Sequence, residues 1–173
     1  MNYIEQLGEK ALEAKRKIAT ASTGEKNKVL EAIAQVLLEN SDAILAENEK
    51  DIANARDNGI SETMVDRLRL TKERIKGIAD ACMELVNLED PVGEVLQGSV
   101  RPNGMRITKV RVPMGVIGII YESRPNVTAD AFGLCFKTGN VVILRGGKDA
   151  IHSNQAIVEC IQEALAEQDL PKE

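Results

Sequence analysis

Two short polar segments hold the residues best suited to bind a ligand. Residues 121–126 read YESRPN and residues 145–148 read RGGK. Guanidinium, ammonium, hydroxyl and amide groups bind phosphates well, and paired glycines let a ligand approach the backbone closely. The pattern therefore predicts an anion-binding site. Its candidate residues are Ser123, Arg124, Pro125, Asn126, Arg145, Gly146, Gly147 and Lys148.

The spacing of the neighbouring elements places both segments at one edge of a parallel sheet. Residues 116–120 and 141–144 are continuous apolar runs, which predicts two strands covered by helices on both faces. A helix is predicted from about Pro125 to Thr138, and another from about Ala150 to Gln168. In open α/β sheets, ligands bind outside the carboxyl ends of the strands, where these two segments lie.

Each segment also has a purely structural interpretation. Ser123 or Asn126 would then cap the following helix, and the glycine turn would only reverse the chain between a strand and a helix. No G-x-G-x-x-G motif follows the first strand, and no P-loop is present. The usual dinucleotide-binding fingerprint is therefore absent.

The remaining reactive side chains do not form a catalytic constellation. His152 lies in the first turn of the last predicted helix, where a charged imidazole is disfavoured, so we interpret it as a polar helix-start residue. Cys82, Cys135 and Cys160 fit neither a metal site nor a disulfide framework, and the last two lie on apolar helix faces. We predict no catalytic residue and no metal ligand in this chain.

The first ninety residues predict a series of helices. Apolar residues recur at spacings of three and four, and Lys and Glu alternate on the polar faces. Ser41 is predicted to cap the third helix, which ends near Asn58-Gly59, and a short helix follows over 61–69. Thr71 is predicted to cap a longer helix that reaches about Leu88.

A β-hairpin is predicted between these helices and the parallel strands. Residues 95–100 and 105–112 are strand-like, and Pro102-Asn103-Gly104 forms the turn. The second strand alternates with period two, which predicts one buried and one solvent-exposed face. Its open edge is able to pair with a second copy of the chain.

Composition limits the function classes. With 173 residues, 43% of them hydrophobic, the chain can bury one core. A net charge of −5 disfavours nucleic acid as a partner. No apolar run approaches the roughly 18 residues of a membrane span, and the charged N-terminus lacks a signal-peptide core. We expect a cytoplasmic protein with no membrane partner.

These segments together resemble the aldehyde dehydrogenase superfamily, beginning with VPMGVIG at residues 112–118. Four further matches narrow the resemblance to the γ-glutamyl phosphate reductase family, and the resemblance runs over the whole chain. They are YESRPNVT at 121–128, KTGN at 137–140, ILRGG at 143–147 and AIHSN at 150–154.

The resemblance implies an α/β fold made of N-terminal helices, a β-hairpin and the first β-α-β-α of an incomplete Rossmann-like sheet. Residues 1–90 would be helical, 91–112 the oligomerisation hairpin and 113–173 the partial Rossmann-like unit, all in the N-terminal part of an NADP-binding domain. The implied activity is NADPH-dependent reduction of L-glutamyl 5-phosphate to L-glutamate 5-semialdehyde in proline biosynthesis. The implied assembly is a homo-oligomer.

The resemblance also predicts the cofactor. Arg145 takes the place of a superfamily Lys that contacts the adenine ribose, and Lys148 takes the place of a Glu that binds the ribose hydroxyls in NAD-preferring members. An ammonium in place of a carboxylate attracts a 2′-phosphate, so we predict NADP(H). The loop at 121–126 departs from the superfamily's oxyanion-stabilising Asn, so no oxyanion role is assigned.

Family members have more than twice this length, and their catalytic cysteine lies in a separate downstream domain. We therefore expect a fragment without its catalytic domain and without activity of its own. One alternative is a non-catalytic fragment that self-associates through the hairpin and binds no cofactor. Another is a stand-alone nucleotide-binding module of different function, which the missing glycine motif disfavours.

Overall fold

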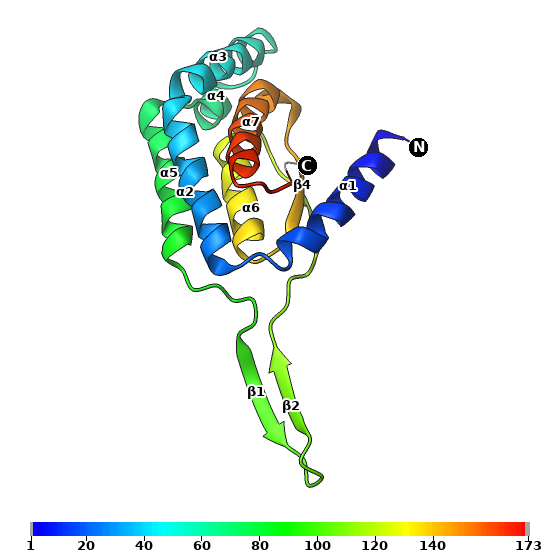
Figure 1. The fold of residues 1–173 in the computed structure, drawn as a ribbon. Coiled ribbons are helices and arrows are strands. Elements are labelled where there is room, and N and C mark those ends of the chain that lie inside the picture. The colour runs from blue at the N-terminus through cyan, green and yellow to red at the C-terminus, as the bar shows by residue number, and fades with distance from the viewer. Residues whose placement is uncertain (1, 172–173) are drawn as a thin grey trace.

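A computed structural model describes residues 2–171 of the chain (Figure 1). Met1 and residues 172–173, which the predicted range 1–173 includes, lie outside the described residues. Five helices precede the first strand, as the sequence predicts. They are α1 (Tyr3–Ile18), α2 (Thr23–Glu39), α3 (Ser41–Asp57), α4 (Glu62–Leu68) and α5 (Lys72–Asn87).

Polar side chains define where several of these helices begin. Ser22 and Glu25 form a reciprocal capping box at the start of α2. Thr71 caps α5 by accepting from the backbone N–H of Arg74, as predicted. The prediction for Ser41 is wrong: Asn40 occupies the N-cap position of α3 and Ser41 is already helical. The reason is that α2 runs to Glu39, so Asn40 closes one helix and opens the next.

The core lies where α2 packs against α5 and against α7 (Ile151–Glu167). Leu30 and Leu37 of α2 are fully buried there, together with Ile157 of α7. α6 (Asn126–Lys137) lies beside both α5 and α7 and contributes the buried ring of Phe136 (Figure 1). Aliphatic residues, with leucine and isoleucine among the largest of them, thus fill a core that has few aromatics.

β3 (Val116–Ile120) and β4 (Val141–Arg145) form a two-stranded parallel sheet. The expectation that helices cover both faces is wrong for β3, whose residues are half-buried or exposed, and Ile120 is 86% exposed. α6 and α1 pack against β4, whereas β3 has fewer such contacts. A short 3-10 turn, Lys148–Ala150, connects β4 to α7.

The hairpin projects away from the helical body (Figure 1). β1 (Val95–Val100) pairs antiparallel with β2 (Arg106–Val110), and Gly104 adopts the positive φ of +85° that the tight turn requires. The predicted buried face of the second strand is wrong, because every residue of both strands is exposed. An arm that projects into solvent cannot bury either face of its strands within one chain.

A buried charge cluster anchors the base of this arm. Asp90 forms an ion pair with Lys26, and it accepts hydrogen bonds from Thr23 Oγ1 at 2.9 Å and from Val92 N at 3.0 Å. Lys26 Nζ also donates to the backbone oxygen of Lys137 at 3.2 Å. Burial alone would raise the pKa of Asp90, but these hydrogen bonds and the Lys26 charge hold the pKa below its ordinary value.

Candidate functional site

The two predicted binding segments lie side by side at the carboxyl end of the sheet. Ile120 pairs with Arg145 in the parallel register, and the backbone N–H of Tyr121 donates to the Arg145 oxygen at 3.1 Å. The predicted proximity of the two loops is therefore confirmed. The connection through α6 allows β3 and β4 to run parallel and side by side, so the loops that follow the two strands lie at the same edge of the sheet.

The two glycines are required by contact between these loops. A Cβ at Gly147 would lie 2.3 Å from Ser123 Oγ and 3.1 Å from Ser123 N. A Cβ at Gly146 would lie 2.4 Å from Asn154 Nδ2 and 3.0 Å from the Tyr121 ring. The space that a Cβ would need at either glycine is thus already filled by protein atoms. Close packing of the two loops therefore explains both glycines without a bound ligand.

A series of hydrogen bonds between hydroxyl and amide groups connects the first loop to the helices next to it. Tyr121 Oη lies 2.7 Å from Thr128 Oγ1, and Thr128 Oγ1 donates to Asn154 Oδ1 at 3.0 Å. Thr128 is completely buried and Asn154 nearly so. These hydrogen bonds connect the first loop to α6 and α7, and the sequence analysis did not predict them. Polar residues on otherwise apolar helix faces were the signal available in the sequence.

The two candidate cations lie at the surface beside these closely packed loops. Arg145 and Lys148 are exposed, and the only hydrogen bond from either side chain within residues 2–171 is a long one, 3.4 Å, from Arg145 Nη1 to the Gly146 oxygen. Ser123 Oγ donates to Asp149 Oδ2 at 3.4 Å, so the carboxylate of Asp149 also lies next to the first loop. The cations remain available to a phosphorylated ligand at the sheet edge.

The N-terminus of α7 is already occupied by a side chain from α3. Asp51 Oδ1 accepts from His152 N at 3.2 Å, and Asp51 Oδ2 accepts from Ser153 N at 2.8 Å and from Ser153 Oγ at 2.6 Å. A pyrophosphate therefore cannot use these amides, although a helix start after a parallel strand is the usual place for it. Arg145 and Lys148 thus offer positive charges of the kind that a ribose phosphate requires, whereas the amides of His152 and Ser153 at the start of α7 are not free to bind a pyrophosphate.

Arg124, Pro125 and Asn126 contribute to a different part of the surface. They line a pocket of about 580 Å³ together with residues of α4 and α5. The capping alternative for Ser123 and Asn126 is wrong, because no side chain caps α6 and Asn126 Nδ2 instead donates to Asp130 Oδ2 at 3.0 Å. Burial raises the pKa of Asp130, and the hydrogen bond from Asn126 opposes that change.

The cysteines and the histidine take structural positions. All three thiols are buried, and burial raises the pKa of Cys82 and of Cys160 to about 11 and also raises that of Cys135. A thiol in this setting is mostly protonated at neutral pH and reacts slowly. His152 is half-exposed, with Nδ1 3.7 Å from a carboxylate oxygen of Glu47. The core positions predicted for Cys135 and Cys160 are confirmed.

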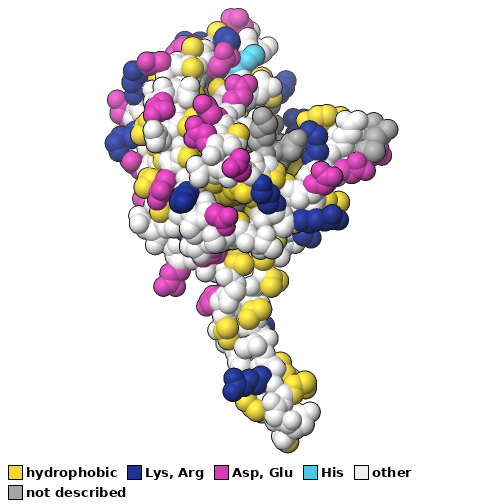
Figure 2. All heavy atoms as spheres, in the orientation of Figure 1, with side chains coloured by type: hydrophobic (Ala, Val, Ile, Leu, Met, Phe, Trp, Pro, Cys, Tyr) yellow, Lys and Arg dark blue, Asp and Glu magenta, His cyan; other side chains and the backbone are white. Residues whose placement is uncertain are grey.

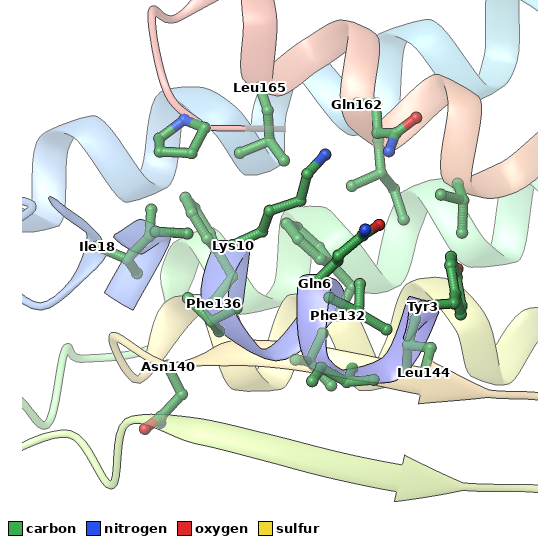
Figure 3. Close-up of a pocket in the computed structure, with 18 residues that line it drawn as sticks. Tyr3, Gln6, Lys10, Ile18, Phe132, Phe136, Asn140, Leu144, Gln162 and Leu165 are labelled. Atoms are coloured by element: carbon green, nitrogen blue, oxygen red, sulfur yellow. The ribbon is translucent and has the colours of Figure 1, made fainter. Parts of the chain in front are cut away.

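A second hollow, of about 430 Å³, lies beneath α1 (Figure 3). Phe132 and Phe136 of α6, Leu144 of β4 and Leu165 of α7 line it, and its walls are mainly apolar. Lys10 of α1 also lines it, whereas Arg145 and Lys148 of the two loops do not. Within residues 2–171, no helix is long and apolar enough to cross a membrane, and no cluster of acidic, His or Cys side chains is placed to hold a metal.

Comparisons with known proteins agree on one family. The sequence profile of the aldehyde dehydrogenase family matches residues 2–173. The chain is 55% identical over 172 residues to a γ-glutamyl phosphate reductase of Clostridium botulinum (strain Alaska E43 / Type E3), covering 99% of this chain and 42% of the relative. It is 54% identical over 168 residues to the same enzyme of Escherichia coli (strain SMS-3-5 / SECEC), covering 97% and 40%.

A solved structure gives the same result for the fold. The crystal structure of γ-glutamyl phosphate reductase from Thermotoga maritima superposes with a TM-score of 0.97 at 47% identity, covering 99% of this chain and 41% of that one. The chain thus spans about two fifths of the length of the relatives it matches. The aldehyde dehydrogenase-like α/β fold is therefore present in part, and the chain belongs to the aldehyde dehydrogenase family.

Proposed function

We propose that this chain is the N-terminal, cofactor-binding part of a γ-glutamyl phosphate reductase. The whole enzyme would reduce L-glutamyl 5-phosphate to L-glutamate 5-semialdehyde with NADPH and release phosphate. The observation that carries this proposal is the 55% identity to such a reductase over 99% of the chain. The name of that relative describes the substrate, and a nicotinamide cofactor is implied by the aldehyde dehydrogenase family.

The proposed cofactor contacts lie on the two loops. Arg145 and Lys148 stand exposed at the end of β4, where they would hold the phosphorylated adenine ribose of NADP(H). Ser123, Gly146 and Gly147 form the packed loop pair beneath them and fix the backbone from which both cations project. The cofactor itself supplies the hydride. The residues of this chain bind and orient it.

The absence of a reactive thiol among the described residues agrees with a supporting role. The reaction class requires an activated nucleophile that can accept the acyl group. Cys82, Cys135 and Cys160 are buried with raised pKa values, so none of them is suited to attack. We therefore propose that the 173-residue chain has no reductase activity alone.

The hairpin supports a proposal about assembly. Apolar side chains gather along it in the space-filling view, whereas the helical body carries mixed charges (Figure 2). Val100 is 67% exposed and Val112 72% exposed, and each strand has one unpaired edge. We propose that this arm pairs with another copy in a cytoplasmic homo-oligomer. Self-association without cofactor binding is the alternative function.

Lys148→Glu tests the cofactor proposal. The substitution places a carboxylate beside the proposed 2′-phosphate, so NADPH affinity should fall at least about tenfold while NADH affinity falls less. Isothermal titration with each nucleotide measures both affinities. Lys28→Glu, an equal charge change at an exposed position of α2, should leave the preference unchanged. An unaltered preference in Lys148→Glu would contradict the proposal.

A further inference from the structure

Two segments, 88–94 and 111–115, connect the hairpin arm to the helical body. Each contains a glycine with positive φ, +86° at Gly93 and +120° at Gly115. Glycine backbones adopt many conformations, so these positions would allow the arm to swing unless other contacts hold them. The two segments are also joined to each other, because Gly93 N donates to the Arg111 oxygen at 2.9 Å. The direction of the arm therefore depends on what holds this pair of segments.

The first segment is held by the start of α2 through buried charges. The side chains of Lys26 and Asp90, which form an ion pair, are only 1% and 9% exposed. Thr23 Oγ1 donates to the same carboxylate oxygen of Asp90, and Val92 N donates to the other oxygen at 3.0 Å. Asp90 thus connects the arm to α2 and also fixes the turn of its own segment.

The second segment is held by the turn between α6 and β4. Asn140 Oδ1 accepts from Gly115 N at 2.8 Å, and Val141 N donates to the Gly115 oxygen at 2.9 Å. A Cβ at Gly139 would lie 2.8 Å from Pro113 Cγ and 3.4 Å from Val92 Cγ2. The α6–β4 turn therefore contacts both segments that carry the arm.

Lys137, at the end of α6, joins these two attachments. Its backbone oxygen accepts from Lys26 Nζ at 3.2 Å. Its own Nζ donates to Asn27 Oδ1 at 2.7 Å and to the Val86 oxygen at 3.2 Å, and the residue is 3% exposed. Because buried charged groups tolerate little change in the positions of their partners, such a network favours one geometry. We refer to Thr23, Lys26, Asp90, Lys137 and Asn140 as the arm joint.

The arm joint leads directly into the parallel sheet. Gly115 immediately precedes β3, and Asn140 immediately precedes β4. The loops at 121–126 and 145–148 follow the opposite ends of the same two strands. The arm and these loops are therefore connected through five-residue strands that are paired along their whole length.

We propose that the arm joint holds the hairpin at one fixed angle to the parallel sheet, so that arm and sheet move as a single rigid body. If the arm pairs with a second copy, the joint also fixes how the loops of one copy are oriented relative to those of the other. Only this consequence rests on the proposed function. An arm that is already oriented loses less conformational entropy when it docks.

The distance between two spin labels, measured by pulsed electron resonance, tests the joint in the 173-residue chain. One label is attached on the arm at Thr108→Cys and the other on α7 at Gln155→Cys, both exposed positions. The native thiols are buried and react slowly, so the new cysteines take up the label. Val100→Lys in the same chain places a charge on the exposed arm to keep copies apart, and unlabelled chain is added to remove distances between copies.

With the joint intact, we expect one narrow distance distribution. Lys26→Met combined with Asp90→Asn removes both buried charges together, so that neither is left unpaired. This double variant should broaden the distribution by about twofold or more, because the arm is then held by fewer contacts. Thr23→Val keeps both charges and removes one hydrogen bond to Asp90, so it should broaden the distribution less. It provides the test if the double variant does not fold.

Arg111→Gln is the matched control. The ion pair of Arg111 with Glu94, at 2.6 Å, also lies at the base of the arm, but both side chains are about half exposed. Exposed ion pairs contribute little, so the width should not change. A broad distribution with the joint intact, an unchanged width in the joint variants, or equal broadening in Arg111→Gln would each overturn the proposal. A narrow distribution, together with light scattering that shows the chain with its native Val100 to be monomeric, would support the joint and refute the proposed assembly.

Discussion

Asp51 and Ser153 join the middle of α3 to the start of α7 across 102 positions of sequence. One carboxylate oxygen of Asp51 accepts from both the backbone N–H and the hydroxyl of Ser153, at 2.8 Å and 2.6 Å. Both residues are almost completely buried, and Ser153 Oγ also accepts from Asn48 Nδ2 at 2.9 Å. α7 is thus capped by a side chain of a distant helix, which fixes the turn that carries Lys148.

Asp51→Asn should destabilise the chain because an amide nitrogen cannot accept the hydrogen bonds that the replaced oxygen accepted. A buried amide left without an acceptor costs about 2 kcal/mol, so the free energy of unfolding should fall by about that amount. Urea denaturation measures the change. Asp57→Asn, at the exposed end of the same helix, is the control and should be nearly neutral. Equal stabilities of the two variants would contradict the role of Asp51.

Gly147→Ala should separate the two loops. The added methyl group would lie 3.1 Å from the backbone nitrogen of Ser123, which a side-chain rotation cannot move. We expect a loss of about 1–3 kcal/mol in unfolding free energy and weaker NADPH binding. Gly118→Ala in β3 meets no atom within 4 Å and should change stability by less than about 1 kcal/mol. Thermal unfolding and nucleotide titration of both variants provide the comparison.

The buried thiols should make the chain less stable at alkaline pH. The pKa of Cys82 and of Cys160 is about 11 in the folded state, against an ordinary value of 9.0. From about pH 9 the unfolded chain loses these protons first, so the stabilising contribution, complete below pH 9, declines until about pH 11. The difference in unfolding free energy between pH 8 and pH 10.5 should shrink in a Cys82→Ala, Cys160→Ala double variant. An unchanged difference would exclude the thiols as its cause.

The hairpin should mediate self-association. Lysine at position 100 or 107 introduces like charges where two copies would meet, so Val100→Lys and Ile107→Lys should lower the mass measured by light scattering. Leu12→Lys adds the same charge at an exposed position of α1 and should leave the mass unchanged. A wild-type chain that stays monomeric at high concentration would refute the proposed interface.

The local rules of helix and strand formation made much of the fold predictable. The cap at Thr71, the turn at Gly104 and the adjacency of the two loops follow from short-range sequence signals that the structure confirms. The prediction for Ser41 failed because two helices share Asn40 as their boundary. The alternation of apolar and polar residues in β2 correctly predicted a strand. It did not predict whether either face of that strand is covered, and both faces are exposed.

The candidate site was only partly predictable, because some of its residues meet only through tertiary packing. Arg145 and Lys148 could be identified because they follow a recognisable strand. The acceptor role of Asp51 at α7 and the convergence of Arg69 with Arg124 depend on contacts between distant segments. Nothing in the local pattern near Arg69 marks it as a neighbour of residue 124. Only the packing of α5 against α6 brings the two segments to the same pocket.

Calorimetric titration of the unmodified 173-residue chain with NADPH and, separately, with NADH tests the cofactor site most directly. We predict saturable binding of NADPH and weaker binding of NADH, because Arg145 and Lys148 both attract the additional phosphate. Binding of neither nucleotide, or equal binding of both, would contradict the claim that this chain holds the NADP(H) of a γ-glutamyl phosphate reductase.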